Sequence, residues 1–146
     1  MRPFGIEISN RQKCHPFNRD FLIRMTRAAY PACREALRET NAPLATLTGL
    51  EATILSDRRI GRVHREFFGD PSPTDVITFH HGEIVLGAGV VIENAARFGR
   101  TPDEEAALCL IHGLLHLAGW EDDTPAAAKK MAFRQEQIFK QTRRMV

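Results

Sequence analysis

Two histidines, His112 and His116, stand four residues apart and could hold one metal ion between them. Residues at this spacing project from the same face of an α-helix, so the two imidazoles would meet at one point. A neutral imidazole is a good zinc ligand, and a catalytic zinc site takes three protein ligands and keeps its fourth position open. Because such a pair also arises by chance in helical cores, its surroundings decide between a metal site and a structural role.

The surroundings of the pair favour a metal site. Between Ala106 and Ala118 nearly every residue is apolar apart from Gly113 and the two histidines, and buried imidazoles are costly unless something binds them. Gly119 is a typical helix stop, and three acidic residues follow it at positions 121–123. A carboxylate from this run could therefore complete a site begun by the two imidazoles.

The helix that must carry the histidines has the clearest signals in the chain. Thr101 is a good N-cap, Pro102 suits the first helical position, and Glu104 stands where a capping box needs it. A helix that is apolar on all sides is a buried one. We therefore expect the metal site at the end of a buried central helix.

Hydrophobic periodicity and turn residues predict the other elements. We expect strands at residues 5–9, 46–55, 75–79 and 83–86, the last two as a hairpin joined by His80-His81-Gly82. We expect helices at residues 21–38, 57–68, 88–98, 102–118 and 125–144, the first with a kink or break at Pro31. Together these predict an α+β fold, with a small mixed sheet of about four strands packed with about five helices.

Length and composition predict one domain over residues 1–146, since the chain is long enough to bury a core and holds no repeat or linker. No apolar run approaches the roughly 18 residues that cross a bilayer. The N-terminus lacks the apolar segment of a signal peptide. Cys14, Cys33 and Cys109 are odd in number and widely spaced, which is typical of a reducing compartment. We expect a cytoplasmic monomer that does not bind membranes.

Charge is distributed unevenly along the chain. Residues 1–40 carry a net charge of +4 and residues 124–146 of +5, whereas the stretch between them carries −7. Basic ends around an acidic centre suit a protein that binds a polyanion outside and a cation inside. The alternative is that the basic ends are the solvated faces of ordinary surface helices, and charge alone does not choose between the two.

Residues 112–122, which read HGLLHLAGWED, resemble the HGxLHLxGYDH signature of the YbeY endoribonucleases, a family of bacterial rRNA maturation factors. Residues 73–79 (PTDVITF) are similar to the family's PTDVLSF segment, and residues 82–86 (GEIVL) to its GDIVI strand. With the following helix the resemblance covers about residues 55–135. It implies a metal held by three histidines, cleavage of single-stranded RNA, and work on the 3′ end of 16S rRNA and in ribosome quality control.

Asp122 stands where the family has its third metal-binding histidine. An aspartate oxygen can replace an imidazole, and two histidines with one carboxylate form a known catalytic arrangement. We therefore predict His112, His116 and Asp122 as the metal ligands and catalytic residues, with a helix-capping role for Asp122 as the alternative. We expect one Zn²⁺ per chain, or another divalent ion such as Ni²⁺.

The RNA contacts are less well defined by the resemblance. Phe68 aligns with a basic residue that the family uses near its cleft, and Arg62 or Arg65, about a turn earlier, could substitute for it. Thr74 and Asp75 are predicted to bind substrate, with a turn cap before the strand as the alternative. His64 stands where the family usually has asparagine.

The predicted function is a metal-dependent endoribonuclease with small-subunit rRNA and the ribosome or its proteins as partners. Zincin proteases carry glutamate directly after the first histidine of their motif, whereas this chain has Gly113 there, so the general base must lie elsewhere. Glu121 and Glu83 are candidates. One alternative is a non-catalytic ribosome-assembly or rRNA-binding factor with a structural metal. The other is a metallohydrolase acting on a peptide or small molecule.

Overall fold

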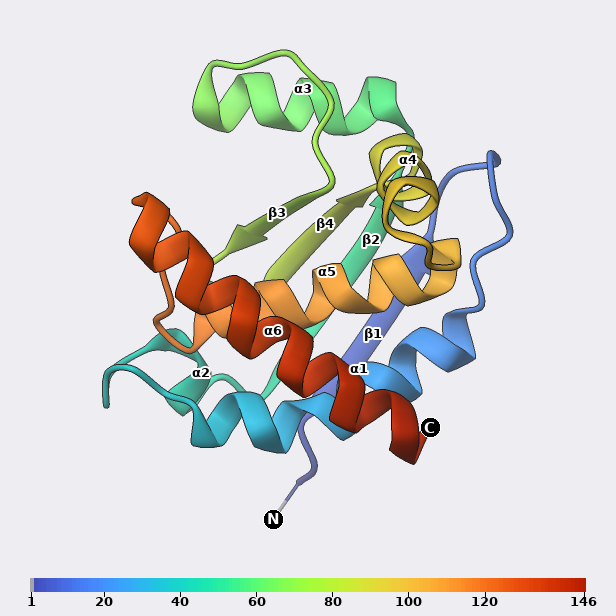
Figure 1. Ribbon diagram of the computed structural model, residues 1–146. Helices are drawn as coiled ribbons and strands as arrows, with labels where there is room; N and C mark the ends of the chain where they lie inside the picture. The colour runs from blue at the N-terminus through green and yellow to red at the C-terminus, as the bar shows by residue number, and fades with distance from the viewer. Residues whose placement is uncertain (1) are drawn as a thin grey trace.

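The sheet of the protein is four-stranded and mixed, as the computed structural model shows for residues 2–146 (Figure 1). Its order is β1-β2-β4-β3, with β1 and β4 both parallel to β2, and β3 antiparallel to β4. The strands span Gly5–Asn10 (β1), Gly49–Leu55 (β2), Val76–Phe79 (β3) and Glu83–Gly87 (β4). The predicted α+β class, the four strands, the edge position of β1 and the hairpin are confirmed.

In the described part of the chain, residues 2–146, six helices accompany the sheet, one more than predicted. They span Arg19–Glu35 (α1), Pro43–Thr46 (α2), Asp57–Phe68 (α3), Ala88–Phe98 (α4), Pro102–Leu117 (α5) and Pro125–Met145 (α6). The additional helix, α2, is a single turn with proline at its first position, and it delays the start of β2 to Gly49.

A kink or a break was predicted at Pro31, and the break is wrong. Helix α1 continues through this exposed proline to Glu35, because both halves are docked in the core by Met25 and Ala29 before it and Cys33 after it.

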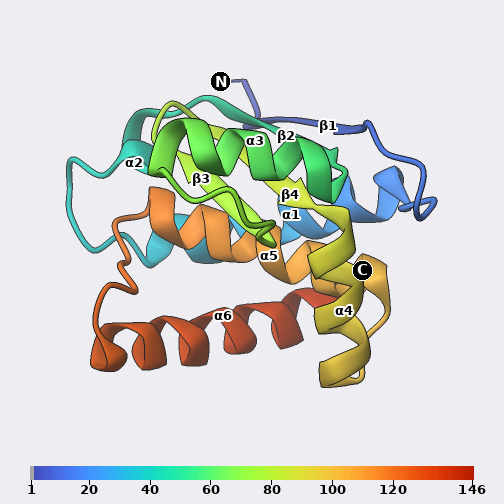
Figure 2. The same ribbon diagram turned by 90° about the horizontal axis from the view of Figure 1, so that it is seen from above.

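Helices cover the two faces of the sheet unequally. Helices α1 and α5 pack on one face, with α6 outside them, whereas α3 lies over the β3–β4 side of the other (Figures 1 and 2). The main core lies between the sheet and α5, whose residues are buried almost throughout, as predicted for a helix that is apolar on all sides. A smaller cluster lies under α3 and contains Leu55, Ile60, Ile77 and Val85. No helix within residues 2–146 is long and apolar enough to span a membrane.

Both ends of α5 are fixed as the sequence predicts. At the start, the Thr101 hydroxyl accepts a hydrogen bond from the Glu104 amide at 3.1 Å, and the Glu104 carboxylate accepts one from the Thr101 amide at 3.0 Å. At the end, Gly119 adopts φ of +95°, a left-handed conformation that glycine accepts without strain. The Trp120 indole then donates to the Ala36 carbonyl at 2.8 Å. The chain after α5 is thereby turned back toward the helix.

Gly113, between the two histidines, allows α5 to approach the sheet closely. A Cβ atom at this position would lie 2.6 Å from Cδ1 of Ile84 and 3.0 Å from Oγ1 of Thr78, on β4 and β3. The position that carries glutamate in zincins therefore faces the sheet here. The absence of a side chain sets how closely His112 and His116 sit above the strands.

Candidate metal centre

Three side chains converge at the C-terminal end of α5. His112 and His116 come from the helix, and Asp122 comes from the loop that turns back after it. The two Nε2 atoms are 3.0 Å apart, and Oδ2 of Asp122 lies 3.5 Å from Nε2 of His112 and 3.4 Å from that of His116. In a tetrahedral zinc site with bonds of about 2.0–2.1 Å, ligand atoms lie roughly 3.3 Å apart. The three groups therefore fit a divalent metal at the vertices of one tetrahedral face.

The second nitrogen of each imidazole is held by an oxygen acceptor. Nδ1 of His116 lies 2.9 Å from the carbonyl oxygen of Trp120, and Nδ1 of His112 lies 2.6 Å from Oε1 of Gln135 on α6. These contacts place the proton of each neutral ring on Nδ1 and leave a lone pair on Nε2. Two lone pairs facing each other at 3.0 Å repel, and a cation between them removes the repulsion.

Burial keeps His112 in the neutral form that could bind a metal. Desolvation, assisted by the neighbouring His116, lowers the pKa of His112 below its ordinary value. The ring is therefore neutral at neutral pH, as metal ligation requires. Nearby, burial raises the pKa of the Cys109 thiol well above its ordinary value, so this side chain stays protonated in the core.

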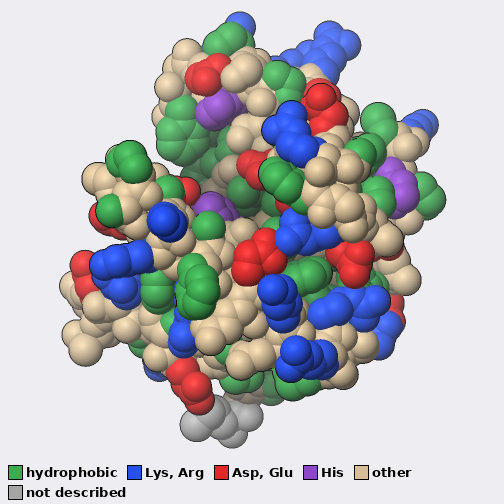
Figure 3. Space-filling model, viewed as in Figure 1, with side chains coloured by type: hydrophobic (Ala, Val, Ile, Leu, Met, Phe, Trp, Pro, Cys, Tyr) green, Lys and Arg blue, Asp and Glu red, His purple; other side chains and the backbone are tan. Residues whose placement is uncertain are grey.

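The metal centre lies where two hollows meet. The first, here called the metal cleft, has a volume of about 410 Å³ and is lined by His64, Phe68, Thr74, Asp75, Val76, Ile77, Thr78, His80, His112, His116 and Asp122. Histidine surface is visible inside a hollow below α3 in Figure 3. The second hollow, of about 500 Å³, opens between α4, α5 and α6. Asp75, His112 and Asp122 line both, so a ligand in either would reach the same three side chains.

Some of the residues predicted to contact RNA line the metal cleft, and others lie away from it. Thr74 and Asp75 line the metal cleft, directly before β3. Arg62 and Arg65 are exposed on α3 and do not line it, because His64 and Phe68 occupy the cleft-facing side of that helix. The role of the two arginines in binding RNA stays a prediction.

The candidate bases from the sequence also lie elsewhere. Glu83 begins β4 at the hairpin and contacts His81 at 3.1 Å, and Glu121 lines a separate hollow beside the start of α6. Asp75 is the carboxylate that sequence reasoning did not consider as a base. Its position in the PTD segment directly before a strand was the available signal.

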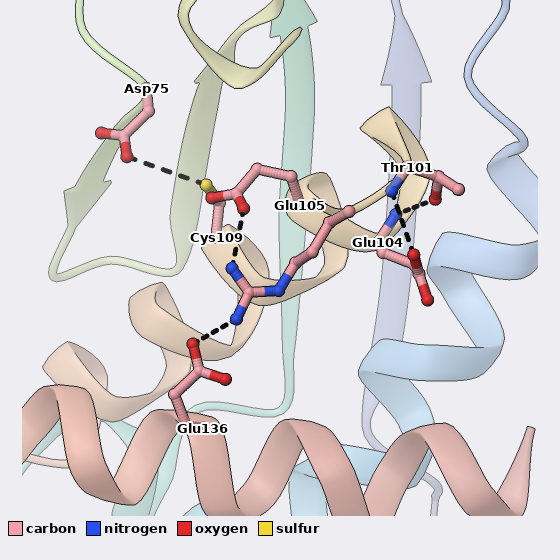
Figure 4. A network of polar contacts seen from close by, with 7 residues as sticks. Asp75, Thr101, Glu104, Glu105, Cys109 and Glu136 are labelled. Carbon is pink, nitrogen blue, oxygen red and sulfur yellow. Dashed lines mark hydrogen bonds and ion pairs between the residues drawn. The ribbon is translucent and has the colours of Figure 1, made fainter. Parts of the chain in front are cut away.

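A charged network forms the wall of the second hollow. Arg100 donates to the carboxylates of Glu105 on α5 and Glu136 on α6, and the Cys109 thiol lies 3.9 Å from Asp75 (Figure 4). Burial raises the pKa of Glu105, and the Arg100 guanidinium opposes that rise. Since Arg100 is matched by two carboxylates, it leaves no free positive charge facing the metal centre.

The sequence profile of the family described as Endoribonuclease YbeY matches residues 7–143. The chain belongs to the YbeY family. The resemblance found in the sequence is thereby confirmed, and it extends over nearly the whole chain. The YbeY family assignment also agrees with the place of the metal centre, at the end of the helix that carries the family-like motif.

Named relatives agree with the assignment to the YbeY family. A protein of Thermotoga neapolitana named Endoribonuclease YbeY is 36% identical over 91 residues, which is 59% of this chain and 61% of that protein. A protein of Symbiobacterium thermophilum with the same name is 27% identical over 151 residues, covering 92% of this chain and 94% of the relative. The solution structure of a Thermotoga maritima protein has the same fold, with a TM-score of 0.63 at 24% identity over 94% of this chain and 88% of that one.

Proposed function

We propose that this protein is a metal-dependent endoribonuclease that cuts single-stranded RNA. The observation that carries the proposal is the set of three ligand atoms, 3.0–3.5 Å apart, with both imidazoles oriented by bonds to Nδ1. A set of this kind binds a divalent metal in a cleft open to a ligand. The relatives named Endoribonuclease YbeY support a phosphodiester of RNA as the bond that is cut.

The proposed metal is Zn²⁺, for which two histidines and one carboxylate are a suitable ligand set, and Ni²⁺ is the alternative. A divalent ion here would supply Lewis acidity to the phosphoryl group that is attacked. Asp122 adds a negative charge that a third imidazole would not, and this strengthens attraction for the cation while reducing the acidity available to the reaction.

Asp75 is the proposed general base. Its carboxylate lines both hollows beside His112, where it would take a proton from the 2′-hydroxyl or from water. The neighbouring Thr74 hydroxyl lines the same cleft and would donate to a phosphate oxygen. The chain thus offers a base and a phosphate donor from one short segment before β3.

The proposed cellular role is maturation of the 3′ end of 16S rRNA, together with ribosome quality control in the cytoplasm. Membership of the YbeY family supports this role. The proposed partners are small-subunit rRNA and the ribosome or its proteins, with the chain acting as a monomer.

One observation favours a second candidate, a ribosome-assembly or rRNA-binding factor whose metal is structural. Within residues 2–146, neither lysine nor arginine lines the metal cleft, although RNA cleavage requires a polyanion to enter it. In such a factor, the helices would bind rRNA and the metal would hold the loop after α5 in place.

Metal content and RNA cleavage, measured together, test the proposal. Wild type, His112→Ala and Asp122→Asn should be purified side by side, assayed for bound metal by elemental analysis, and incubated with end-labelled single-stranded RNA. We expect near-stoichiometric metal and cleavage in the wild type, and loss of both in each variant. Metal with no cleavage in the wild type would favour the structural-metal factor. Metal retained by Asp122→Asn would exclude that residue as a ligand. It would not make Asp122 a helix cap, because the N-cap of α6 is Thr124.

A further inference from the structure

The outer face of α6 carries a groove that the metal chemistry does not use. It has a volume of about 570 Å³ and is here called the outer groove, lined by Arg38, Trp120, Ala126, Lys129, Lys130, Phe133, Arg134 and Gln137. These residues come from the segment after α1, the loop after α5 and residues 126–137 of α6. In Figure 3, basic and hydrophobic side chains lie side by side along α6.

The outer groove is strongly positive. Four of its lining residues are lysine or arginine and none is acidic, and none of the four cations forms an ion pair within residues 2–146. Arg134 bonds only the neutral Gln137, at 3.1 Å, and its Nε is buried with no hydrogen-bond partner in that part of the chain. These charges are therefore available to an anionic ligand.

An aromatic ring stands free among these charges. Phe133 is 74% exposed, the highest value among the large hydrophobic side chains that face solvent. Trp120, by contrast, is fixed by its indole hydrogen bond to Ala36 and covered by the Arg38 guanidinium, which lies 4.7 Å from the ring centroid. The groove thus combines the fixed indole of Trp120 with the phenyl ring of Phe133, whose outer side faces solvent.

We propose that the outer groove binds single-stranded RNA, with a base stacked on Phe133 and phosphates held by Lys129, Lys130 and Arg134. Stacking rings interleaved with cations are the features that hold unpaired strands without regard to sequence. A duplex hides its base faces inside the stack and cannot use an exposed ring in this way.

The position of the outer groove connects it to the metal centre. Trp120 lines the groove, and its carbonyl oxygen accepts the Nδ1 hydrogen bond of His116; Asp122 follows two residues later. A strand lying in the groove would therefore pass the loop that supplies the third ligand. This part of the inference rests on the proposed endoribonuclease function, whereas binding in the groove does not.

Charge decides between RNA and a protein partner. A protein surface that matched the groove would have to place several carboxylates against a floor that is largely apolar. A nucleic acid meets both demands with each nucleotide, since its phosphates are anionic and its bases are flat and apolar. The adjoining hollow near Gly119 is lined by Glu39 and Glu121 as well as by Arg38 and Lys130, so its charges balance, whereas no acidic residue within residues 2–146 lines the outer groove.

Binding of a short single-stranded 2′-O-methyl oligonucleotide, measured by fluorescence anisotropy at several salt concentrations, tests the inference without cleavage. Phe133→Ala should weaken binding roughly five- to a hundredfold and leave the salt dependence unchanged. Lys129→Ala with Lys130→Ala should weaken binding and reduce the slope of log K against log salt by roughly 0.7 for each phosphate that the protein no longer neutralises. Met145→Ala and Lys140→Ala, exposed on the same helix outside the groove, are the matched controls and should bind as wild type does.

The outcomes separate this inference from the proposed function. Wild-type affinity in both the Phe133 and the lysine variants would overturn the RNA groove and leave that surface to a protein. Equal losses in the control variants would overturn it as well, because general charge and exposed hydrophobic area would then explain binding. Groove-dependent binding without cleavage of ordinary RNA would reject the endoribonuclease and keep the groove. If the Phe133 and lysine variants bound the oligonucleotide normally and also cleaved ordinary RNA, the groove would be rejected and the endoribonuclease kept.

Discussion

The metal cleft and the outer groove meet at the same short loop, yet their chemistry is opposite. The metal cleft is partly buried, and among the described residues it is lined by imidazoles and carboxylates but by no lysine or arginine. The outer groove is open and is lined, in the same part of the chain, by four lysine or arginine residues but by no carboxylate. Helix α6 serves both, since Gln135 faces His112 and Phe133 faces solvent. The contrast shows that the fold separates the groups suited to reaction from those suited to binding a polyanion.

Asp75→Asn should have the largest effect that leaves the metal in place. The substitution keeps the shape of the side chain and removes its ability to take a proton, so cleavage should fall about 10²- to 10⁴-fold. Metal content and oligonucleotide affinity should remain at wild-type levels. Rates under single-turnover conditions and elemental analysis would measure this. Full-rate cleavage by Asp75→Asn would show that another residue is the base. It would also weaken the conclusion that the reactive groups lie in the metal cleft and the RNA-binding groups in the outer groove.

Gln135→Leu should reduce metal affinity by about 10- to 100-fold, because Nδ1 of His112 would lose its acceptor and the ring its fixed orientation. Gln135→Glu should restore affinity, since a carboxylate oxygen accepts the same hydrogen bond. Competition with a chelator of known affinity would measure both. The outer groove should be unaffected, because this side chain lies on the opposite face of α6. Equal metal affinity in the leucine variant and the wild type would contradict the positioning role.

A pH titration should separate the two regions, because only the metal cleft holds imidazoles. In the metal-free protein, the folded pKa of His112 is lowered, so the unfolded chain binds more protons below about pH 6.5. The free energy of unfolding should therefore decrease as pH falls from about 6.5 toward the lowered pKa, by at most about 1.4 kcal/mol per pH unit for this one group. Thermal unfolding between pH 5 and 7.5 would measure it, and His112→Asn should flatten the profile. If the free energy of unfolding changed with pH in the same way for wild type and His112→Asn, the result would contradict a buried neutral ring at His112.

The smallest effects should come from helix caps. Thr101→Ala removes the N-cap of α5 and should lower the free energy of unfolding by about 1 kcal/mol, without changing metal content or oligonucleotide binding. Thr124→Ala removes the N-cap of α6, where the hydroxyl accepts from the Ala127 amide at 3.1 Å, and should cost a similar amount. Only the second should also weaken oligonucleotide binding, since it loosens the start of the helix that lines the outer groove. Identical binding by both variants would contradict this.

Local signals in the sequence were sufficient for the elements that position the site. The capping box at Thr101, the stop at Gly119 and the hairpin at residues 80–82 all depend on neighbours in the chain, and all are found in the structure. The same holds for the convergence of His112 and His116, which follows from helical spacing alone. The position of Asp122 beside the two histidines could be predicted because a turn of only a few residues returns the chain to the helix.

Features that depend on distant packing were not accessible in this way. The continuation of α1 through Pro31 requires both halves to be docked in the core, and the placement of Arg62 away from the metal cleft depends on how α3 is rotated over the sheet. The outer groove requires Arg38 to meet a helix that begins at Pro125. The hydrophobic periodicity of one segment cannot predict contacts between segments that are distant in the sequence.

The hydrogen bond from His112 to Gln135 also has a consequence for the order of assembly. Synthesis is vectorial, so α5 leaves the ribosome before α6 and its first histidine initially lacks an acceptor for Nδ1. The ligand geometry is complete only after the later helix has docked. A nascent chain with α6 still in the exit tunnel would thus carry the motif without an assembled site, at the moment when it is closest to ribosomal RNA.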